Sequence, residues 1–174
     1  TGSDIQEVEV ASSVLSKHNG VTHVYLQQYH KGIEVWNAIV NVNVTGQGKV
    51  LNSGNRFVRN IAAATGGQNA RKSAVDAANT AAGHLKLKPK KAFEVAQRKG
   101  GLNQAVRLSD AGIAARPIEA RLVWLPTESN VRLAWAVEIE EAVGNGWTYS
   151  FIDAENGELL RQESLVSQDS ARSI

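Results

Sequence analysis

Apolar and polar side chains alternate near the start of the chain in a pattern that predicts three consecutive β-strands. Lys31-Gly32 supplies a tight turn after the first of these segments, and Thr45–Gly48 supplies another after the second. Consecutive strands that are joined by short turns pair in antiparallel fashion, so we expect a meander. The three predicted strands are, in chain order, Val24–Tyr29, Ile33–Val44 and Lys49–Phe57.

Two departures from strict alternation predict where this meander is irregular. In the second strand, Ile33 lies on the same face as Asn41, whereas Val40 lies on the opposite face. One face must therefore pass from covered to solvated along the strand. In the third strand, the segment Ser53–Asn55 interrupts the apolar pattern, which predicts a bulge or a bend.

The rest of the chain predicts two helices and six further strands. Apolar residues within Ile5–Leu15 indicate a short N-terminal helix that Ser3 or Asp4 caps. The alanine-rich segment Asn69–Leu85 indicates a second helix. The clearest hairpin turns at Gly144–Gly146. The segments expected as strands, each bounded by Gly, Pro, Asn or Asp, are Ala92–Arg98, Gln104–Ser109, Ile118–Pro126, Val131–Glu140, Trp147–Ile152 and Glu158–Ser164.

These elements group into two units. Residues 4–60 contain the N-terminal helix and the meander, and residues 61–67, rich in alanine and glycine, are expected to form a linker. Residues 68–165 form the second unit, and residues 166–174 form a polar tail without structure signals. Each unit then combines a helix with a curved antiparallel sheet, which is the α+β class, and a weak internal duplication is plausible.

The composition limits the classes of protein that this sequence can encode. Its 174 residues, of which 43% are hydrophobic, can bury one substantial core or two small ones, which argues against a wholly disordered chain. The absence of cysteine excludes disulfides and cysteine-rich zinc sites, and it fits a reducing compartment or an exported bacterial protein equally well. No apolar run is long enough to span a bilayer, and a secretory leader before Thr1 could have been removed.

The net charge of +2 conceals an uneven distribution along the chain. Arg71–Arg132 holds 12 Lys or Arg against 5 Asp or Glu, whereas Leu133–Glu163 holds 1 against 7. These stretches could neutralise each other within one sheet, which is the favoured interpretation, or they could steer the chain toward a charged partner. Four lysines cluster around Pro89 without interleaved aromatic residues, so we do not expect nucleic acid to bind.

The histidines do not form the pattern of a zinc peptidase, His-Glu-x-x-His, which places two imidazoles one helical turn apart beside a glutamate base. His23 and His30 lie on opposite sides of a turn but lack a third ligand of comparable quality. We therefore expect histidines that pack within strands or lie at the surface. The four are His18, His23, His30 and His84.

Other catalytic arrangements are also missing from the sequence. Without cysteine there is no thiol nucleophile, and no serine lies in a Gly-x-Ser-x-Gly elbow. The glycine pairs lack a phosphate-binding fingerprint. Glu138, Glu140 and Glu141 end a predicted strand and are expected to form a solvated rim rather than a general acid–base pair. We therefore predict a chain without catalytic, metal-binding or cofactor-binding residues of its own.

Two motifs in the sequence resemble those of one protein family. QQYHKGIEVWNAIVNVNVTGQGKVLNSGNRF is similar to the fungalysin/thermolysin propeptide motif, in which a Gln pair, a Gly-Ile-x-Val turn, an Asn-rich strand and Gly-Lys-Val lead to an S-x-G-N-x-F segment. LAWAVEIE, followed by WTYSFIDAENGELL, is similar to the PepSY-type, cystatin-like domain that follows in these propeptides. The resemblance covers roughly Asp4–Gln168 and is closer to the fungalysin branch. It implies the propeptide of a fungalysin-type zinc metallopeptidase, built as two tandem cystatin-like units.

The resemblance also implies a function and a partner. A propeptide of this class assists the folding of its own catalytic domain and keeps a secreted or periplasmic enzyme latent until cleavage. The zinc is expected in the partner catalytic domain and no cofactor in this chain, and neither nucleic acid nor membrane is an expected partner. The tail that ends in Ser173 and Ile174 is expected to occupy the catalytic cleft, where a cut near Ile174 would leave a carboxylate facing the zinc. A processing junction beyond Ile174 is the alternative.

Five residues of the motif are candidates for contact with the catalytic domain. Gln27, Gln28, Tyr29 and Gly32 lie at the tip of the first hairpin, where binding residues are often placed, and Arg56 is a candidate for an acidic partner surface. The alternative is structural: the glutamines satisfy backbone groups, and the glycine supplies a positive φ.

Other functional classes remain open at the level of the sequence. The main one is a stand-alone secreted or periplasmic cystatin-like inhibitor that blocks metallopeptidases in trans, and His-Glu-x-x-His encoded downstream in the same gene would decide between the two. A ligand-binding module would require an apolar pocket that the alternating strands do not demand.

Overall fold

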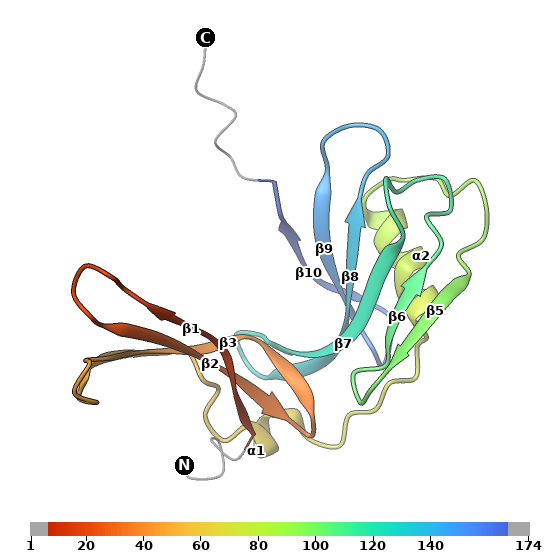
Figure 1. Cartoon of the computed structure of the whole chain (residues 1–174). Helices are drawn as coiled ribbons and strands as arrows, with labels where there is room; N and C mark the ends of the chain where they lie inside the picture. The colour runs from red at the N-terminus through yellow and green to blue at the C-terminus, as the bar shows by residue number, and fades with distance from the viewer. Residues whose placement is uncertain (1–6, 167–174) are drawn as a thin grey trace. The chain divides into compact units, whose positions relative to one another are not determined.

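The computed structural model describes residues 7–166, which form ten strands and two helices (Figure 1). The chain divides into two compact units: unit 1 is Thr1–Gly66 with Trp124–Val131, and unit 2 is Gly67–Val123 with Arg132–Ile174. The strands are β1 (Val8–Leu15), β2 (Thr22–His30), β3 (Ile33–Val44), β4 (Val50–Asn55), β5 (Val95–Gly100), β6 (Ala105–Leu108), β7 (Ile118–Pro126), β8 (Val131–Glu140), β9 (Trp147–Asp153) and β10 (Leu159–Ser164), and the helices are α1 (Ile61–Thr65) and α2 (Ala74–His84).

Unit 1 is built on the meander that the alternation predicts. Strands β1, β2, β3 and β4 pair in sequence order, each antiparallel to the next. Lys31 and Gly32 have φ angles of 51° and 71°, and this pair of positive values gives a type I′ turn between β2 and β3. The three strands expected between residues 22 and 57 are therefore confirmed.

A bulge in β3 explains why the two faces of this strand exchange polarity. Ile33 and Val35 are buried, and the buried series continues at Ala38 and Val40. Between them Asn37 has a φ of 55°, and the pairing of β3 with β2 shifts its register in this region. Across this region β3 advances five residues, from Glu34 to Ile39, while β2 advances two, from Tyr29 to Gln27. An odd number of extra residues moves every later side chain to the opposite face, so the predicted change of face is confirmed and lies around Asn37.

The irregularity predicted for the third strand of the meander lies elsewhere. The pairing of β3 with β4 is regular at Ser53 and Gly54 and shifts between Asn43 and Val44. The prediction of a bulge at Ser53–Asn55 is therefore wrong in its position. Asn43 pairs with Asn52 and Val44 with Val50, so the extra residue of β4 is Leu51, next to the β3–β4 turn.

Unit 2 contains the longer helix and most of the core. Ser73 and Asp76 form a reciprocal capping box at the start of α2, with N–H···O distances of 3.1 Å and 2.9 Å. Alanines at five positions of α2 are buried, and their small side chains let the helix approach β9 and β10 closely. The Trp135 indole donates to the carbonyl of Lys72 at 2.8 Å. The helix expected over Asn69–Leu85 is present but begins later, at Ala74, and the six later strands are confirmed.

The predicted fold class is wrong. The prediction was α+β, with two tandem cystatin-like units that each pack a helix on a curved antiparallel sheet. The described residues are mainly β-strand, and hydrogen bonds join the strands into one mixed sheet in the order β1-β2-β3-β7-β8-β9-β10. One pairing, between Val35 on β3 and Trp124 on β7, is parallel. The α1 helix of unit 1 has five residues and lies within the stretch predicted as a linker.

The predicted N-terminal helix is also wrong. Val8–Leu15 forms β1, which pairs along its length with β2. Val8 and Val10 are two residues apart and β-branched, and both features favour a strand once a partner strand is present. The spacing of Val10 and Val14 also suits a helix, so the sequence pattern alone is ambiguous.

Candidate functional site

The hairpin tip of unit 1 is fixed by a carboxylate from outside the hairpin. Glu7, next to β1, accepts hydrogen bonds from the backbone N–H of Lys31 at 3.0 Å and of Gly32 at 2.7 Å. The N–H of Tyr29 donates to the Glu7 carbonyl at 2.7 Å. The type I′ turn leaves both of its N–H groups pointing outward, and Glu7 satisfies them. The motif tip is therefore a rigid turn.

Gln27 and Gln28, predicted to contact a partner, have side chains that lie inside unit 1, with 7% and 0% exposed. Gln27 Nε2 donates to the carbonyls of Val35 at 2.7 Å and Ala38 at 3.3 Å, on either side of the bulge residue in β3. Gln28 pairs with both backbone groups of Val58, at 2.9 Å and 3.0 Å. These side chains satisfy backbone groups that the bulge and the chain after β4 leave without strand partners.

His30 lies at the end of β2 between two other elements of unit 1. Its Nε2 is 3.1 Å from the Thr65 hydroxyl on α1, and its ring packs against that of Trp124 at 5.6 Å between centroids. The Trp124 indole donates to the His30 carbonyl at 2.9 Å. Burial, and secondarily the charge of Lys31, lower the pKa of His30 below its usual value.

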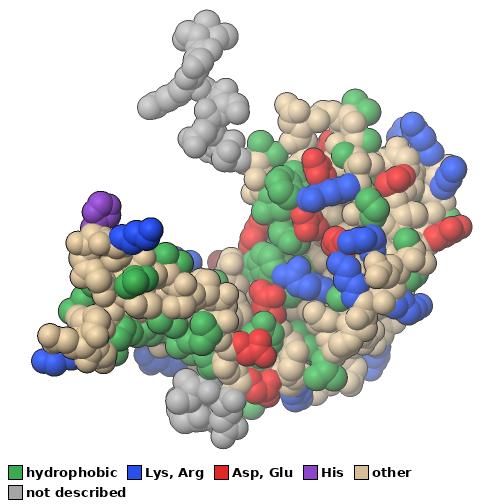
Figure 2. All heavy atoms as spheres, in the orientation of Figure 1, with side chains coloured by type: hydrophobic (Ala, Val, Ile, Leu, Met, Phe, Trp, Pro, Cys, Tyr) green, Lys and Arg blue, Asp and Glu red, His purple; other side chains and the backbone are tan. Residues whose placement is uncertain are grey.

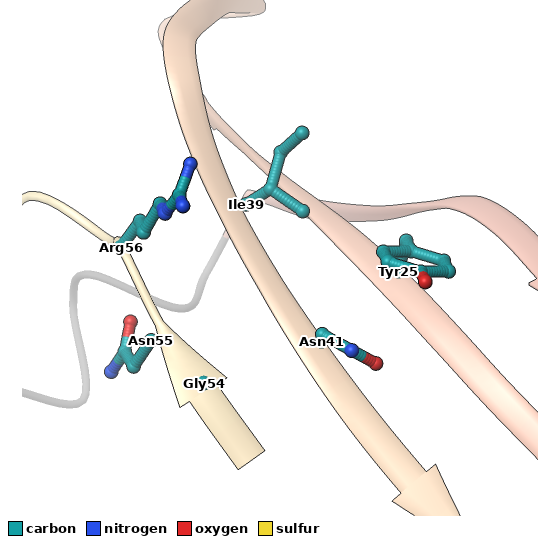
Figure 3. Close-up of a pocket in the computed structure, with 6 residues that line it drawn as sticks. All are labelled: Tyr25, Ile39, Asn41, Gly54, Asn55 and Arg56. Carbon is teal, nitrogen blue, oxygen red and sulfur yellow. The ribbon is translucent and has the colours of Figure 1, made fainter.

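A pocket of about 520 Å³ opens on one face of strands β2, β3 and β4 (Figure 3). Cross-strand pairing places Tyr25, Asn41 and Gly54 in one row, and the backbone N–H of Arg56 bonds the Ile39 carbonyl in the adjacent row at 3.2 Å. In Figure 3 the Arg56 side chain extends from the end of β4 toward β3. The lining residues are Tyr25, Ile39, Asn41, Gly54, Asn55 and Arg56.

The hydrogen-bonding groups of this pocket are not fully satisfied within the described part of the chain. Asn41 Oδ1 is buried and accepts no hydrogen bond there. Arg56 is exposed, and its guanidinium forms no ion pair or hydrogen bond with any residue from 7 to 166. In the next row of the same face, by contrast, His23 and Asn52 both bond the carboxamide of Asn43. Among residues 7–166, the buried side-chain oxygen that lacks a hydrogen-bond partner therefore lies in the lining of this pocket.

The opposite face of the same sheet is apolar. The register places Val10, Leu26 and Val40 in one cross-strand row and Val24 and Val42 in another. Val10 is 63% exposed, and the strand pairing continues the face to Leu15, which is 62% exposed. Figure 2 shows hydrophobic side chains at the surface of unit 1. Exposed aliphatic side chains on a sheet are typical of an interaction surface.

Charges within unit 2 pair across its sheet. Arg116 binds the carboxylates of Glu138 and Glu140, each at 2.8 Å, and Arg132 binds Asp153 at 2.6 Å. These pairs join the basic stretch to the acidic stretch that follows it. The interpretation that the two stretches neutralise each other is therefore confirmed for these residues.

Glu138 is part of a hydrogen-bonded cluster rather than of a solvated rim. Its carboxylate, 18% exposed, accepts from Arg116, from the Trp147 indole at 2.8 Å and from the Tyr149 hydroxyl at 3.0 Å. Burial raises the pKa of Tyr149, and the charge of Glu138 acts in the same direction. All three partners donate to one carboxylate, which is a structural arrangement.

Between residues 7 and 166, no group of three or more His, Cys, Asp or Glu is placed to hold a metal ion. No helix in that range is both long and apolar enough to cross a bilayer.

The structure separates the residues predicted to bind a partner. Gly32 is exposed at the hairpin tip, Tyr29 is half-buried beside it, and Arg56 lies in the pocket. Ser173 and Ile174 lie outside the described residues. The sequence analysis missed Glu7, Tyr25 and Asn41. The alternation does place Tyr25 on the same face as His23, but only the pairing register brings it beside Asn41 and Arg56.

The comparisons with known proteins agree on one family. Residues 7–57 match the family model described as Fungalysin/Thermolysin Propeptide Motif. "Extracellular metalloproteinase 2" of Arthroderma gypseum is 32% identical over 144 residues, which are 82% of this chain and 22% of that protein. "Extracellular metalloproteinase MEP" of Leptosphaeria maculans is 32% identical over 141 residues, 80% of this chain and 22% of that protein.

A third relative extends the similarity over more of the chain. "Extracellular metalloproteinase 2" of Phaeosphaeria nodorum is 29% identical over 158 residues, 90% of this chain and 24% of that protein. The chain thus spans less than a quarter of the length of these relatives. The motif and the relatives together support a propeptide of a fungalysin-type metallopeptidase.

Proposed function

We propose that this chain is the propeptide of a secreted zinc metallopeptidase, and that it helps its catalytic domain to fold and then inhibits it. The observation that carries the proposal is the coincidence of the propeptide motif, residues 7–57, with the complete β1–β4 meander. The relatives are named extracellular metalloproteinases, and the similarity covers less than a quarter of their length. Both findings support a secreted precursor in which a catalytic domain is the partner of this chain.

Assistance in folding requires a surface that is formed before the catalytic domain is complete. The meander provides one, because its turn is fixed by Glu7 and its bulge by Gln27. A preorganised sheet loses little conformational entropy on docking, and a stable complex needs about 1,600 Å² of total buried surface. The apolar face of unit 1 and the pocket on its opposite face are the surfaces we assign to this contact.

Inhibition requires a segment that occupies the catalytic cleft without being turned over. We assign this role to residues 166–174, with the zinc held by the partner domain. Cleavage near Ile174 would create a terminal carboxylate, a good oxygen ligand for a zinc ion. The PepSY-type assignment of residues 68–165 belongs to the same proposal. The alignments with the relatives extend beyond the motif, which supports a propeptide that is longer than the motif alone.

Refolding and inhibition assays with the cognate catalytic domain test this function. The denatured domain should regain activity in good yield when the 174-residue chain is added in trans and poorly without it. The mature peptidase should be inhibited by the same chain, and a version that ends at residue 165 should inhibit more weakly. Equal refolding yield with and without the chain, together with undiminished peptidase activity in its presence, would contradict the proposal.

A further inference from the structure

Gly54 is the next-to-last residue of β4, at a position where neither its backbone nor its surroundings require glycine. Its φ lies outside the positive range, so any L-residue can adopt its conformation. A Cβ atom added there would meet no heavy atom within 4 Å. Glycine inside a strand weakens the strand, and one cause of its presence is the close approach of a ligand or of another chain.

The empty space at Gly54 is part of the pocket. Gly54 pairs directly with Asn41, which pairs in turn with Tyr25, so the missing side chain leaves a gap in an otherwise filled cross-strand row. Arg56 follows two residues later on the same face of the sheet. A side chain at position 54 would occupy part of this pocket.

The charges of the pocket select the kind of group that fits this gap. Arg56 supplies a cation that no described carboxylate neutralises, and none of the six lining residues is acidic. The planar guanidinium binds a carboxylate through two parallel hydrogen bonds. Asn41 presents a carboxamide whose oxygen has no donor, so the pocket also offers a partner for an N–H of the incoming chain.

We infer that this pocket binds an Asp or Glu side chain of the metallopeptidase catalytic domain, with Arg56 as its cation and Gly54 as the opening that admits it. The source of the carboxylate rests on the function proposed above, whereas the chemistry of the site rests on the pocket alone. Tyr25 and Ile39 form the wall against which the stem of the acidic side chain packs (Figure 3).

Two substitutions test the site through different properties. Arg56→Gln removes the cation, and Gly54→Val fills the gap with a residue that favours strands, so the free chain should melt at the same temperature or higher. Both should weaken binding to the cognate catalytic domain at least about tenfold in surface plasmon resonance. Arg59→Gln, which removes an exposed arginine outside the lining, is the matched control and should bind as the unmodified chain does.

A second measurement examines the pocket without the enzyme. N-acetylglutamate, titrated to millimolar concentration into the ¹⁵N-labelled chain, should shift the amide resonances of Asn41, Gly54 and Arg56. The neutral N-acetylglutamine should not, and Arg56→Gln should abolish the shifts. The absence of amide shifts with N-acetylglutamate would overturn the site. So would Arg56→Gln and Gly54→Val variants that bind the catalytic domain as tightly as the unmodified chain does. If that chain fails to bind the domain at all, the proposed function fails and the titration still decides the pocket.

Discussion

Gln28 makes the contact on which the folded end of β4 depends. Its side chain is fully buried and pairs with both backbone groups of Val58. Gln28→Ala leaves that N–H and that carbonyl unpaired, and we expect the free energy of unfolding to fall by about 2–4 kcal/mol in urea denaturation. The exposed Gln47 is the matched control, because its alanine variant should stay within about 0.5 kcal/mol of the unmodified chain. Equal losses for the two variants would contradict the structural role.

His30 makes the stability of unit 1 depend on pH. Its pKa is lowered mainly by burial, so the unfolded chain takes up a proton near pH 6.5 while the folded chain stays neutral. Stability is therefore complete above about pH 6.5 and is lost as the pH falls from that value toward the lower pKa of the folded state. We expect His30→Gln to make the free energy of unfolding depend less on pH. Urea titrations at several values between about pH 7 and pH 5, the range in which histidine titrates, measure this change. A variant with the same pH slope as the unmodified chain would show that His30 does not cause it.

Single residues differ in how far their roles follow from the sequence. Ser73 and Asp76 act on groups three residues away, so the start of α2 is predictable from local chemistry. Glu7 and Gly32 are far apart in sequence, and only the folded register brings the carboxylate to the turn. Arg56 was a candidate because of its place in the motif, but its unpaired guanidinium depends on which side chains three strands place around it.

Strand β3 depends on one residue with an unusual backbone conformation. Asn37 has a φ of 55°, which glycine and asparagine tolerate and a β-branched residue does not. We expect Asn37→Gly to change the free energy of unfolding by less than about 0.5 kcal/mol, and Asn37→Val to reduce it by about 1–2 kcal/mol. Thermal unfolding followed by circular dichroism measures both. Equal stability of the two variants would mean that the chain can shift its register to remove the bulge.

At the level of elements, the sequence predicts strands and turns better than it predicts pairing. The exchange of polarity along β3 is visible in the alternation, yet its cause at Asn37 is not, because asparagine is common in strand ends and turns as well as in bulges. The segment Val8–Leu15 was misassigned as a helix, since its apolar spacing fits both periods. Its pairing with β2 decides the matter, and that contact is made between residues distant in sequence.

For the whole chain, the class was wrong although most elements were correct. A helix was assigned to each unit from local pattern, but α1 has only five residues, and the N-terminal segment is a strand. The parallel pairing of β3 with β7 joins residues about ninety positions apart, from Val35 to Trp124, which no local pattern reports. The predicted neutralisation of the basic stretch by the acidic stretch is correct at this scale, because Arg116 and Arg132 pair with acidic residues of that stretch.

The uneven burial of the strands predicts how backbone amides exchange with solvent. Strands β7 and β8 are largely buried, whereas every residue of β4 is exposed, and all but one of β1. In the free chain we expect hydrogen–deuterium exchange to be slowest in β7 and β8 and fastest among strands in β1 and β4. Binding of the catalytic domain should then slow exchange in β4, because the pocket and the edge of β4 become covered. If β4 exchanged at the same rate in a complex whose peptidase activity is inhibited, the docking surface would have to lie outside the pocket face of unit 1.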